Sequence, residues 1–281
     1  MTGQILEIPI RGKKLSMHVE IKEHLHHRKS QFQSIDIYDT EAFGKLLTLD
    51  GHVQLSLLDE HAYHECLVHI PLLSMDQPRR ALVIGGGDGG VVRELCRHRT
   101  LTDIHMVEID AAVIEACGEY LPELSAGALE DPRVEVLVQD AFPFVKDVTE
   151  PYDLIVMDST DVYEGEDGAL SERLFTSDFY RDCAEALSSE GMLVTQADNL
   201  LFCPYSMEGI TSDLGGVFSR TGHYWGLVPS FGGFSGFVWA SHGAEVSRQY
   251  HLERAQDLGL KYLTPLTYGM AMTTLPFGGA R

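Results

Sequence analysis

The sequence is poor in basic residues. Its 281 residues contain 21 lysines and arginines against 42 aspartates and glutamates, which gives a net charge of −21. Nucleic-acid backbones and anionic membrane surfaces attract basic proteins, so both are poor candidates for partners. Small cationic substrates fit this charge better. We therefore expect no nucleic-acid partner and no membrane partner.

Cysteine pairs, long apolar runs and a leader-like beginning are also missing. No stretch approaches the roughly 18 apolar residues of a membrane-spanning helix. The first residues lack the basic, apolar and small-residue arrangement of a secretory signal. The five cysteines form no C-x-x-C pair, which favours a reduced protein over a disulfide framework; they are Cys66, Cys96, Cys117, Cys183 and Cys203. We expect a soluble, cytoplasmic protein.

The sequence is rich in glycine at one place, the stretch RALVIGGGDGG at residues 80–90. Residues 81–84 are apolar and mostly branched, which predicts a buried strand. After the glycines, apolar residues continue at helical spacing over 91–95. A strand, a glycine turn and a helix form the first unit of a doubly wound α/β sheet.

The glycine turn contains an unexpected carboxylate. Gly85, Gly87 and Gly90 match the dinucleotide-binding pattern G-x-G-x-x-G, which is weak evidence by itself. Asp88, however, stands where the pyrophosphate of a dinucleotide would lie. This position suits a cationic ligand better than an anionic one.

Three further strands are predicted at 104–110, 134–138 and 154–157. Acidic residues end the first of them and follow the other two. In a doubly wound sheet the carboxyl ends of such strands face the ligand crevice. We therefore expect four acids at one edge of the sheet: Asp88, Glu108, Asp140 and Asp158. Glu108 stands where such folds bind a ribose, and Asp140 suits an adenine amino group. Asp88 and Asp158 remain available for positive charge.

Residues 1–57 alternate between apolar and polar side chains over 15–21, 32–38 and 45–49, as strands do. Asp50-Gly51 follows the last of these strands and is a strong hairpin signal. We predict a small antiparallel β lobe at 1–57 and a Rossmann-like catalytic domain of the methyltransferase type at 58–281.

Three histidines in this lobe, His24, His26 and His27, raise the question of a metal site. Their spacing matches no common metal-binding pattern. We interpret them as polar residues of an alternating strand and predict no metal.

In the second half, the pattern predicts a helix at 174–187 and a strand at 192–196, with Asp198 just beyond it. Strands at 225–228 and 236–240 would give the antiparallel ending typical of methyltransferase-like sheets. From residue 258 we expect short extended pieces. The segment 158–172 is strongly acidic; we place Asp158 and Asp161 in the site and assign the other acids of the segment to a solvated surface.

Seven stretches together carry a resemblance to a known family. They are LHHRKSQFQ at 25–33, LDGHVQ at 49–54, DEHAYHE at 59–65, GGGDGG at 85–90, VEID at 107–110, DSTD at 158–161 and LFTSDFY at 174–180. Over nearly its whole length the chain resembles the polyamine aminopropyltransferases, the spermidine synthase family.

The resemblance implies transfer of the aminopropyl group of decarboxylated S-adenosylmethionine, as co-substrate, to an amine, with no bound cofactor. It implies that Asp158 accepts a proton. The residues it assigns to the donor nucleoside are Gln33, Gly85, Gly87, Asp88, Glu108, Asp140 and Ala141. Those it assigns to the polyamine are Tyr63, His64, Asp88, Asp158, Asp161, Gln196 and Asp198. Members are usually homodimers or homotetramers, so we expect a homo-oligomer.

The chain departs from the family on the acceptor side. The Pro-x-Gly-Pro after Asp161 is absent, and Ser230-Phe231 replaces the usual Thr-Tyr after Pro229. Putrescine is the first acceptor to expect, which would make the product spermidine. Spermidine, agmatine or cadaverine as acceptor remain alternatives. A methyltransferase using intact S-adenosylmethionine is a further alternative, which Asp88 disfavours, as is a binding protein without activity.

Overall fold

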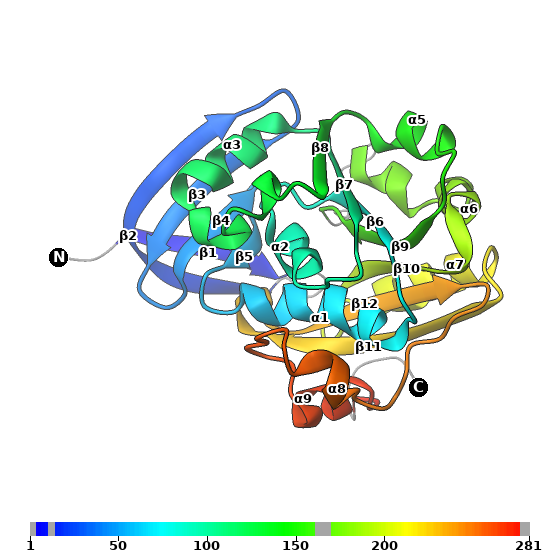
Figure 1. Cartoon of the computed structure of the whole chain (residues 1–281). Coiled ribbons are helices and arrows are strands. Elements are labelled where there is room, and N and C mark those ends of the chain that lie inside the picture. The colour runs from blue at the N-terminus through cyan, green and yellow to red at the C-terminus, as the bar shows by residue number, and fades with distance from the viewer. Residues whose placement is uncertain (1–3, 11–14, 161–169, 276–281) are drawn as a thin grey trace.

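The computed structural model describes residues 4–10, 15–160 and 170–275, and it contains two sheets (Figure 1). An antiparallel sheet of five strands forms the N-terminal lobe. A mixed sheet of seven strands, covered by helices on both faces, forms the rest. The predicted α/β class with a small N-terminal antiparallel lobe is confirmed.

The lobe contains β1 (Gln4–Ile10), β2 (Leu15–Lys29), β3 (Ser34–Thr40), β4 (Gly44–Leu49) and β5 (His52–Ser56), which pair in sequence order. The predicted hairpin joins β4 and β5. Asp50 and Gly51 both have positive φ, 49° and 80°, as the tight turn between twisted strands requires. β1 and β5 were not among the expected strands.

The large sheet has the order β11-β12-β10-β9-β6-β7-β8. Its strands are β6 (Arg80–Gly85), β7 (Asp103–Glu108), β8 (Val134–Val138), β9 (Tyr152–Asp158), β10 (Leu187–Asn199), β11 (Arg220–Val228) and β12 (Gly233–Ser241). β6 to β10 run parallel, and β12 pairs antiparallel with both β10 and β11. From β6 the chain adds β7 and β8 on one side, and it then crosses to the other side of β6 to form β9. A ligand crevice opens at such a switch point.

Helices cover both faces of this sheet. The helices of the described residues are α1 (Glu60–Ser74), α2 (Gly90–Cys96), α3 (Ala111–Tyr120), α4 (Pro122–Ser125), α5 (Ala141–Lys146), α6 (Ser177–Glu185), α7 (Pro204–Gly215), α8 (Leu252–Ala255) and α9 (Pro265–Ala271). Leu154 and Val156 of β9 pack in the core cluster that contains α1 and α2, whereas Ile155 and Met157 pack with α6 and α7. In the described part of the chain, no helix is long and apolar enough to cross a membrane.

The structure corrects the prediction around residue 187. The helix ends at Glu185, and Leu187 already pairs with Tyr152 as the first residue of β10. β10 continues to Asn199, so Asp198 lies within the strand rather than beyond it. Apolar periodicity alone did not show this, because β10 begins where Leu187 pairs with β9 and ends where Asn199 pairs with β12.

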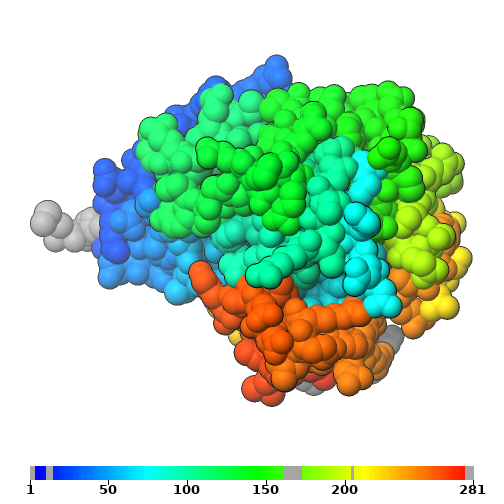
Figure 2. Space-filling model, viewed as in Figure 1, coloured from blue at the N-terminus to red at the C-terminus, as the bar shows by residue number. Residues whose placement is uncertain are grey.

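The tail from residue 258 also differs from the prediction, since it contains the short helix α9 rather than extended pieces. The buried carboxylate of Glu65 on α1 accepts hydrogen bonds from the backbone nitrogens of Lys261, Tyr262 and Leu263 at 2.6–2.9 Å. The tail, orange to red in Figure 2, lies against the layer of α1 and α2. This tertiary contact, rather than local sequence, fixes its path.

Candidate active site

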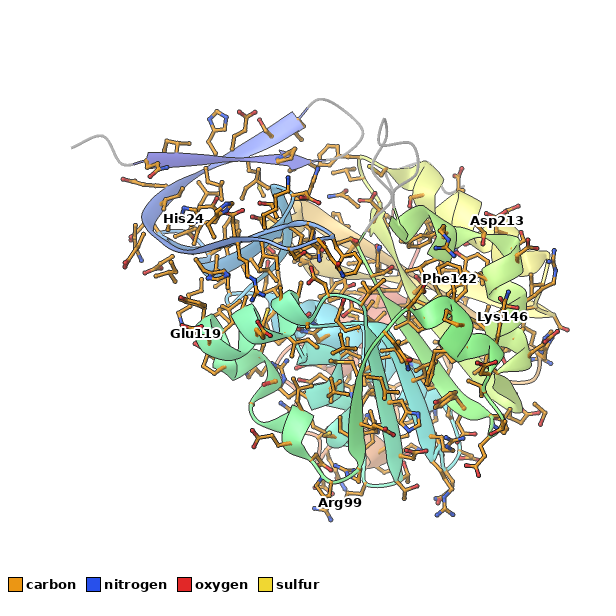
Figure 3. All side chains as sticks on the ribbon, turned by 90° about the horizontal axis from the view of Figure 1, so that it is seen from above. His24, Arg99, Glu119, Phe142, Lys146 and Asp213 are labelled. Atoms are coloured by element: carbon orange, nitrogen blue, oxygen red, sulfur yellow. The ribbon has the colours of Figure 1, made fainter. Side chains whose placement is uncertain are left out.

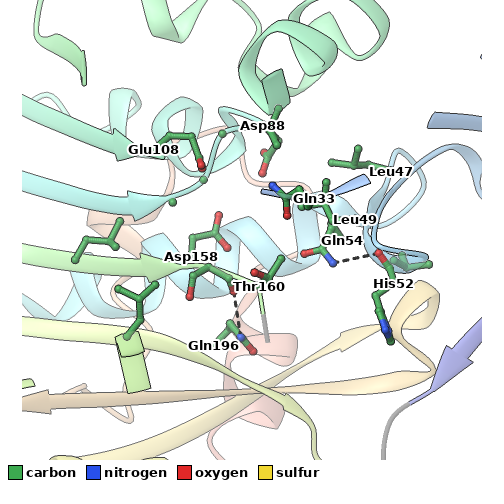
Figure 4. Close-up of a pocket in the computed structure, with 18 of the residues that line it drawn as sticks. Gln33, Leu47, Leu49, His52, Gln54, Asp88, Glu108, Asp158, Thr160 and Gln196 are labelled. Carbon is green, nitrogen blue, oxygen red and sulfur yellow. Dashed lines mark hydrogen bonds between the residues drawn. The ribbon is translucent and has the colours of Figure 1, made fainter. Parts of the chain in front are cut away.

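A cavity of about 370 Å³ lies at the switch point, between the two sheets (Figure 4). Every described residue that the sequence predicted for the site lines it: Gln33, Tyr63, His64, Gly85, Gly87, Asp88, Glu108, Asp140, Ala141, Asp158, Gln196 and Asp198. Asp161 lies outside the described residues. The four acids predicted for one edge of the sheet do meet in one cavity.

The glycine turn lies very close to β9 and α1, which form part of the cavity wall. Gly85 has φ of 85°, and a Cβ atom there would lie 2.2 Å from the backbone oxygen of Asp158. A Cβ atom on Gly90 would lie 2.3 Å from Cε1 of His64. The glycines are therefore needed for the approach of β9 and α1 to the turn, in addition to any contact with a ligand.

Two carboxylates and an imidazole form the centre of the cavity. His64, Asp88 and Asp158 each place one polar atom within 4.8 Å of the others. Asp88 accepts a hydrogen bond from the backbone nitrogen of Gly90 at 2.7 Å, and its Oδ1 lies 3.4 Å from Nε2 of His64. The hydroxyl of Tyr63 donates to Oδ1 of Asp158 at 2.7 Å.

Buried charges behind the cavity hold His64 in its protonated form. Nδ1 of His64 lies 2.7 Å from Oε2 of Glu60, and Arg93 donates to both carboxylate oxygens of Glu60. Burial lowers the pKa of His64, but the negative charges of Asp88, Glu60 and Asp158 outweigh it and raise the pKa to about 9. Burial would raise the pKa of Glu60, but His64 and Arg93 lower it to about 2. His64 therefore carries a positive charge at neutral pH.

Asp158 is a stronger base than an ordinary aspartate. Burial and the charge of Asp88 raise its pKa to about 6, although the charge of His64 and the hydrogen bond from Tyr63 oppose the rise. At pH 7.4 a carboxyl group with this pKa is mostly ionised. It can therefore attract a cation and then accept a proton.

The nucleoside side of the cavity is built from strand ends. Glu108 ends β7, is 8% exposed and accepts a hydrogen bond from the backbone nitrogen of Asp110 at 2.8 Å. Burial raises the pKa of Glu108 to about 7. Asp140 caps α5 by accepting from the nitrogen of Phe142 at 2.9 Å. Both carboxylates thus have fixed positions.

The lobe contributes to this side through the turn between β2 and β3. Gln33 lies in that turn and donates to Oδ2 of Asp110 at 3.0 Å. Ser30 donates to the same oxygen at 2.7 Å. Asp110 therefore joins the lobe to the start of α3, next to Glu108.

The opposite end of the cavity includes aromatic side chains. Phe231, in the short 3₁₀ helix Pro229–Phe231, contacts the ring of Tyr63 edge-on, with centroids 5.6 Å apart. Asp198 has φ of 64°, and its backbone nitrogen donates to Oε1 of Gln196. This end combines a buried acid with an aromatic wall.

Several lining residues were missed as site residues. His52 and Gln54 on β5 line the cavity, and Gln54 donates to the backbone oxygen of His52 at 3.1 Å (Figure 4). They alternate with Val53 immediately after the Asp50-Gly51 turn. The predicted hairpin could have indicated these two residues. Its second strand has to pair with β4, which also lines the cavity.

Comparison with known proteins agrees with this geometry. Residues 60–250 match the family described as "Spermine/spermidine synthase domain", and residues 7–56 match the "Spermidine synthase tetramerisation domain". The chain belongs to the spermine/spermidine synthase family. As a member it is a transferase of the polyamine aminopropyltransferase class, so the predicted family is confirmed.

Similar family members come from different bacteria. The polyamine aminopropyltransferase of Pectobacterium carotovorum strain PC1 is 41% identical over 219 residues, which cover 78% of this chain and 75% of that protein. The one of Moorella thermoacetica is 37% identical over 266 residues, 94% of this chain and 91% of that protein. Both alignments span most of each chain.

Two solved structures of family members share the fold. The spermidine synthase of Thermotoga maritima has a TM-score of 0.89 at 26% identity, covering 98% of this chain and 92% of its own. A spermidine synthase in complex with the transition-state analogue AdoDATO has a TM-score of 0.90 at 26% identity, covering 98% and 93%.

Proposed function

We propose that the protein transfers the aminopropyl group of decarboxylated S-adenosylmethionine to putrescine, giving spermidine and methylthioadenosine. The observation that carries this proposal is the position of Asp88 and Asp158 in one cavity with Glu108 and Asp140. The first pair suits the ammonium groups of two cationic substrates, and the second pair suits a nucleoside.

In this proposal Glu108 binds the ribose hydroxyls and Asp140 the adenine, with Gln33, Ala141, Gly85 and Gly87 forming the surrounding wall. Asp88 holds the ammonium group of the aminopropyl chain. Intact S-adenosylmethionine would bring its carboxylate close to Asp88. The like charges would repel each other, which favours the decarboxylated donor.

The acceptor must lose a proton before it can attack. An alkylammonium with a pKa near that of lysine, about 10.4, is only about one part per thousand neutral at pH 7.4, a deficit of about 4 kcal/mol. Asp158 takes the proton, and the amine nitrogen then forms a bond to the methylene carbon while the carbon–sulfur bond breaks. The sulfur keeps the electron pair, and methylthioadenosine leaves.

The remaining acceptor contacts in the proposal are Tyr63, His64, Gln196 and Asp198, together with Asp161 beyond the described residues. His64 itself does not act as the base, because its raised pKa keeps it protonated. Its charge instead opposes the rise in the pKa of Asp158 and keeps this carboxylate ionised. Binding and orienting both substrates would supply much of the remaining rate.

A different acceptor is the second candidate, and Phe231 favours it. The aromatic wall beside Tyr63 takes the place of a hydroxyl that the family commonly has there. Spermidine, agmatine or cadaverine could then compete with putrescine.

A mass-spectrometric assay with two donors and these four amines tests the proposal. We expect methylthioadenosine and spermidine from decarboxylated S-adenosylmethionine with putrescine. Methylation of any amine by intact S-adenosylmethionine would contradict it, and so would the absence of any product. A faster reaction with another amine would keep the aminopropyl transfer and replace putrescine as the acceptor.

We also propose a homotetramer or homodimer that works in the cytoplasm. The match of 7–56 to a tetramerisation domain supports an assembly, and Ile5 and Leu15 expose 55% and 41% of their surface on this lobe. The five free cysteines suit a reducing compartment. Light scattering after size-exclusion chromatography measures the assembly, and a monomer would contradict it.

A further inference from the structure

Two histidines on β2 lie on the same side of the sheet because the strand is irregular. Residues three apart in a regular strand point to opposite faces. Here His24 pairs with Tyr38, but His26 pairs with Ile37 and His27 with Asp36, so one extra residue, Leu25, is inserted between the pairs. Such a bulge turns the following side chains to the other face. The strict alternation expected from the sequence therefore fails at Leu25.

The bulge directs both imidazoles at one carboxylate. Nε2 of His24 and Nδ1 of His27 each lie 2.8 Å from Oδ1 of Asp36 on β3. Asp36 is only 9% exposed, whereas the two histidines reach solvent. The ring of His24 stacks on Tyr38, with centroids 4.4 Å apart, which restrains its orientation. Figure 3 shows His24 on the N-terminal lobe, and none of the three ligand residues lines the cavity.

In place of the sequence-based prediction of no metal, we propose that His24, His27 and Asp36 form a binding site for a divalent transition-metal ion of the zinc class. Two imidazoles and one carboxylate are a donor set that Zn²⁺ accepts, with water in the fourth position. In tetrahedral geometry, ligand atoms at about 2.1 Å from the ion lie about 3.4 Å from one another. The three ligand atoms lie within 4.8 Å of one another, with the two nitrogen–oxygen separations at 2.8 Å. Small side-chain rotations are therefore enough to admit the ion.

The same residues have a simpler explanation, in which the imidazoles only donate hydrogen bonds to Asp36. The two explanations predict different behaviour toward metal. Hydrogen bonds alone give no saturable binding, whereas a site binds one ion per chain and depends on all three side chains. Because binding ties β2 to β3 and requires the folded lobe, it also stabilises the fold by mass action.

Titration of the full-length, chelator-stripped protein with Co²⁺, followed by displacement with Zn²⁺, tests the proposal. Co²⁺ reports its ligands through visible absorption. We expect one ion per chain with a dissociation constant below about 100 μM. His24→Ala, His27→Ala and Asp36→Asn should each weaken binding at least about tenfold, because each removes one ligand. His18→Ala, an exposed histidine on the same strand before the bulge, should bind like the unmodified chain.

Absence of saturable binding up to about 1 mM Co²⁺ would overturn the proposal. Equal binding by the three variants and the His18→Ala control would overturn it too, because the ion would then lie elsewhere, for example at His64, Asp88 and Asp158 in the cavity. Both histidines reach solvent, so their variants should fold even if Asp36→Asn does not; circular dichroism checks this. Saturating Zn²⁺ should raise the melting temperature by a few degrees in the unmodified chain and the His18→Ala control. The two histidine variants should show no rise.

Discussion

The two ends of the cavity are built differently. On the nucleoside side, Glu108 and Asp140 stand where strands end, and backbone nitrogens hold their carboxylates. On the acceptor side, Phe231 lies in a short 3₁₀ helix, and Asp198 occupies a left-handed conformation at a bulge in β10. Strand ends in a packed sheet have little freedom to move, whereas a connecting segment, such as the one that contains Phe231, changes readily. We therefore expect donor recognition to be the fixed property of this enzyme and acceptor choice the adjustable one.

The largest expected effect concerns the proton acceptor between the two ends. Asp158→Asn should lower kcat about 10²- to 10⁴-fold at pH 7.5, because an amide can accept a hydrogen bond but not the proton. Steady-state kinetics with saturating substrates measure this. Asp178→Asn, which changes an exposed carboxylate on α6, should leave kcat unchanged. An Asp158→Asn enzyme that kept more than about a third of kcat would remove Asp158 from the role of base.

The second prediction separates the two carboxylates on the donor side. Asp88→Asn should weaken decarboxylated S-adenosylmethionine at least about tenfold, because it removes the charge that faces the ammonium group. Methylthioadenosine lacks that group and should bind almost unchanged. Asp140→Asn is the matched variant and should weaken both ligands equally. Calorimetry measures all four affinities, and an equal loss for both ligands in Asp88→Asn would limit Asp88 to shaping the turn.

The third prediction concerns the charge of His64. Glu60→Gln should lower the pKa of His64, because it removes one of the three carboxylates that raise it. His64 then carries less positive charge, which weakens the effect that holds the pKa of Asp158 down. Because Asp158 must be ionised to act, the acid limb of kcat/KM, expected near pH 6, should move up by about one pH unit. The pH profile measures the shift.

The control for Glu60→Gln is Glu94→Gln. Glu94 also pairs with Arg93, at 2.7 Å, but no hydrogen bond joins it to His64. It should leave the acid limb in place even if it lowers stability. If the acid limb of Glu60→Gln lies at the same pH as that of the unmodified chain, Glu60 only supports the fold.

The smallest effect is expected at the acceptor end. Phe231→Tyr adds a hydroxyl beside Tyr63 and should change the ratio of kcat/KM values for putrescine and the longer amines about fivefold, which corresponds to one net hydrogen bond of about 1 kcal/mol. Phe234→Tyr, whose ring packs on Trp225 away from the cavity, is the control. Competition between amines in one reaction measures the ratio. An unchanged ratio would place acceptor choice elsewhere, outside the aromatic wall.

Much of the fold was predictable because it depends on local sequence patterns, such as runs of apolar residues and turn motifs. The strand predicted at 134–138 has the same bounds as β8. The Asp50-Gly51 motif correctly predicted the turn between β4 and β5. The expected end of the helix at residue 187 and the extended tail were wrong for the same reason. Pairing of Leu187 with Tyr152, and the hydrogen bonds from the tail to Glu65, join residues far apart in sequence.

By itself, the sequence determined which acids stand at the strand ends, because a strand of known direction places its last residues at a known edge. It also determined the family, through the order and spacing of seven stretches. The tertiary structure decided the charge of His64 and the strength of Asp158 as a base. These depend on burial and on charges contributed by α1, α2, β9 and the glycine turn together. It also decided that His24 and His27 share a face, because a bulge exists only in the pairing of two strands.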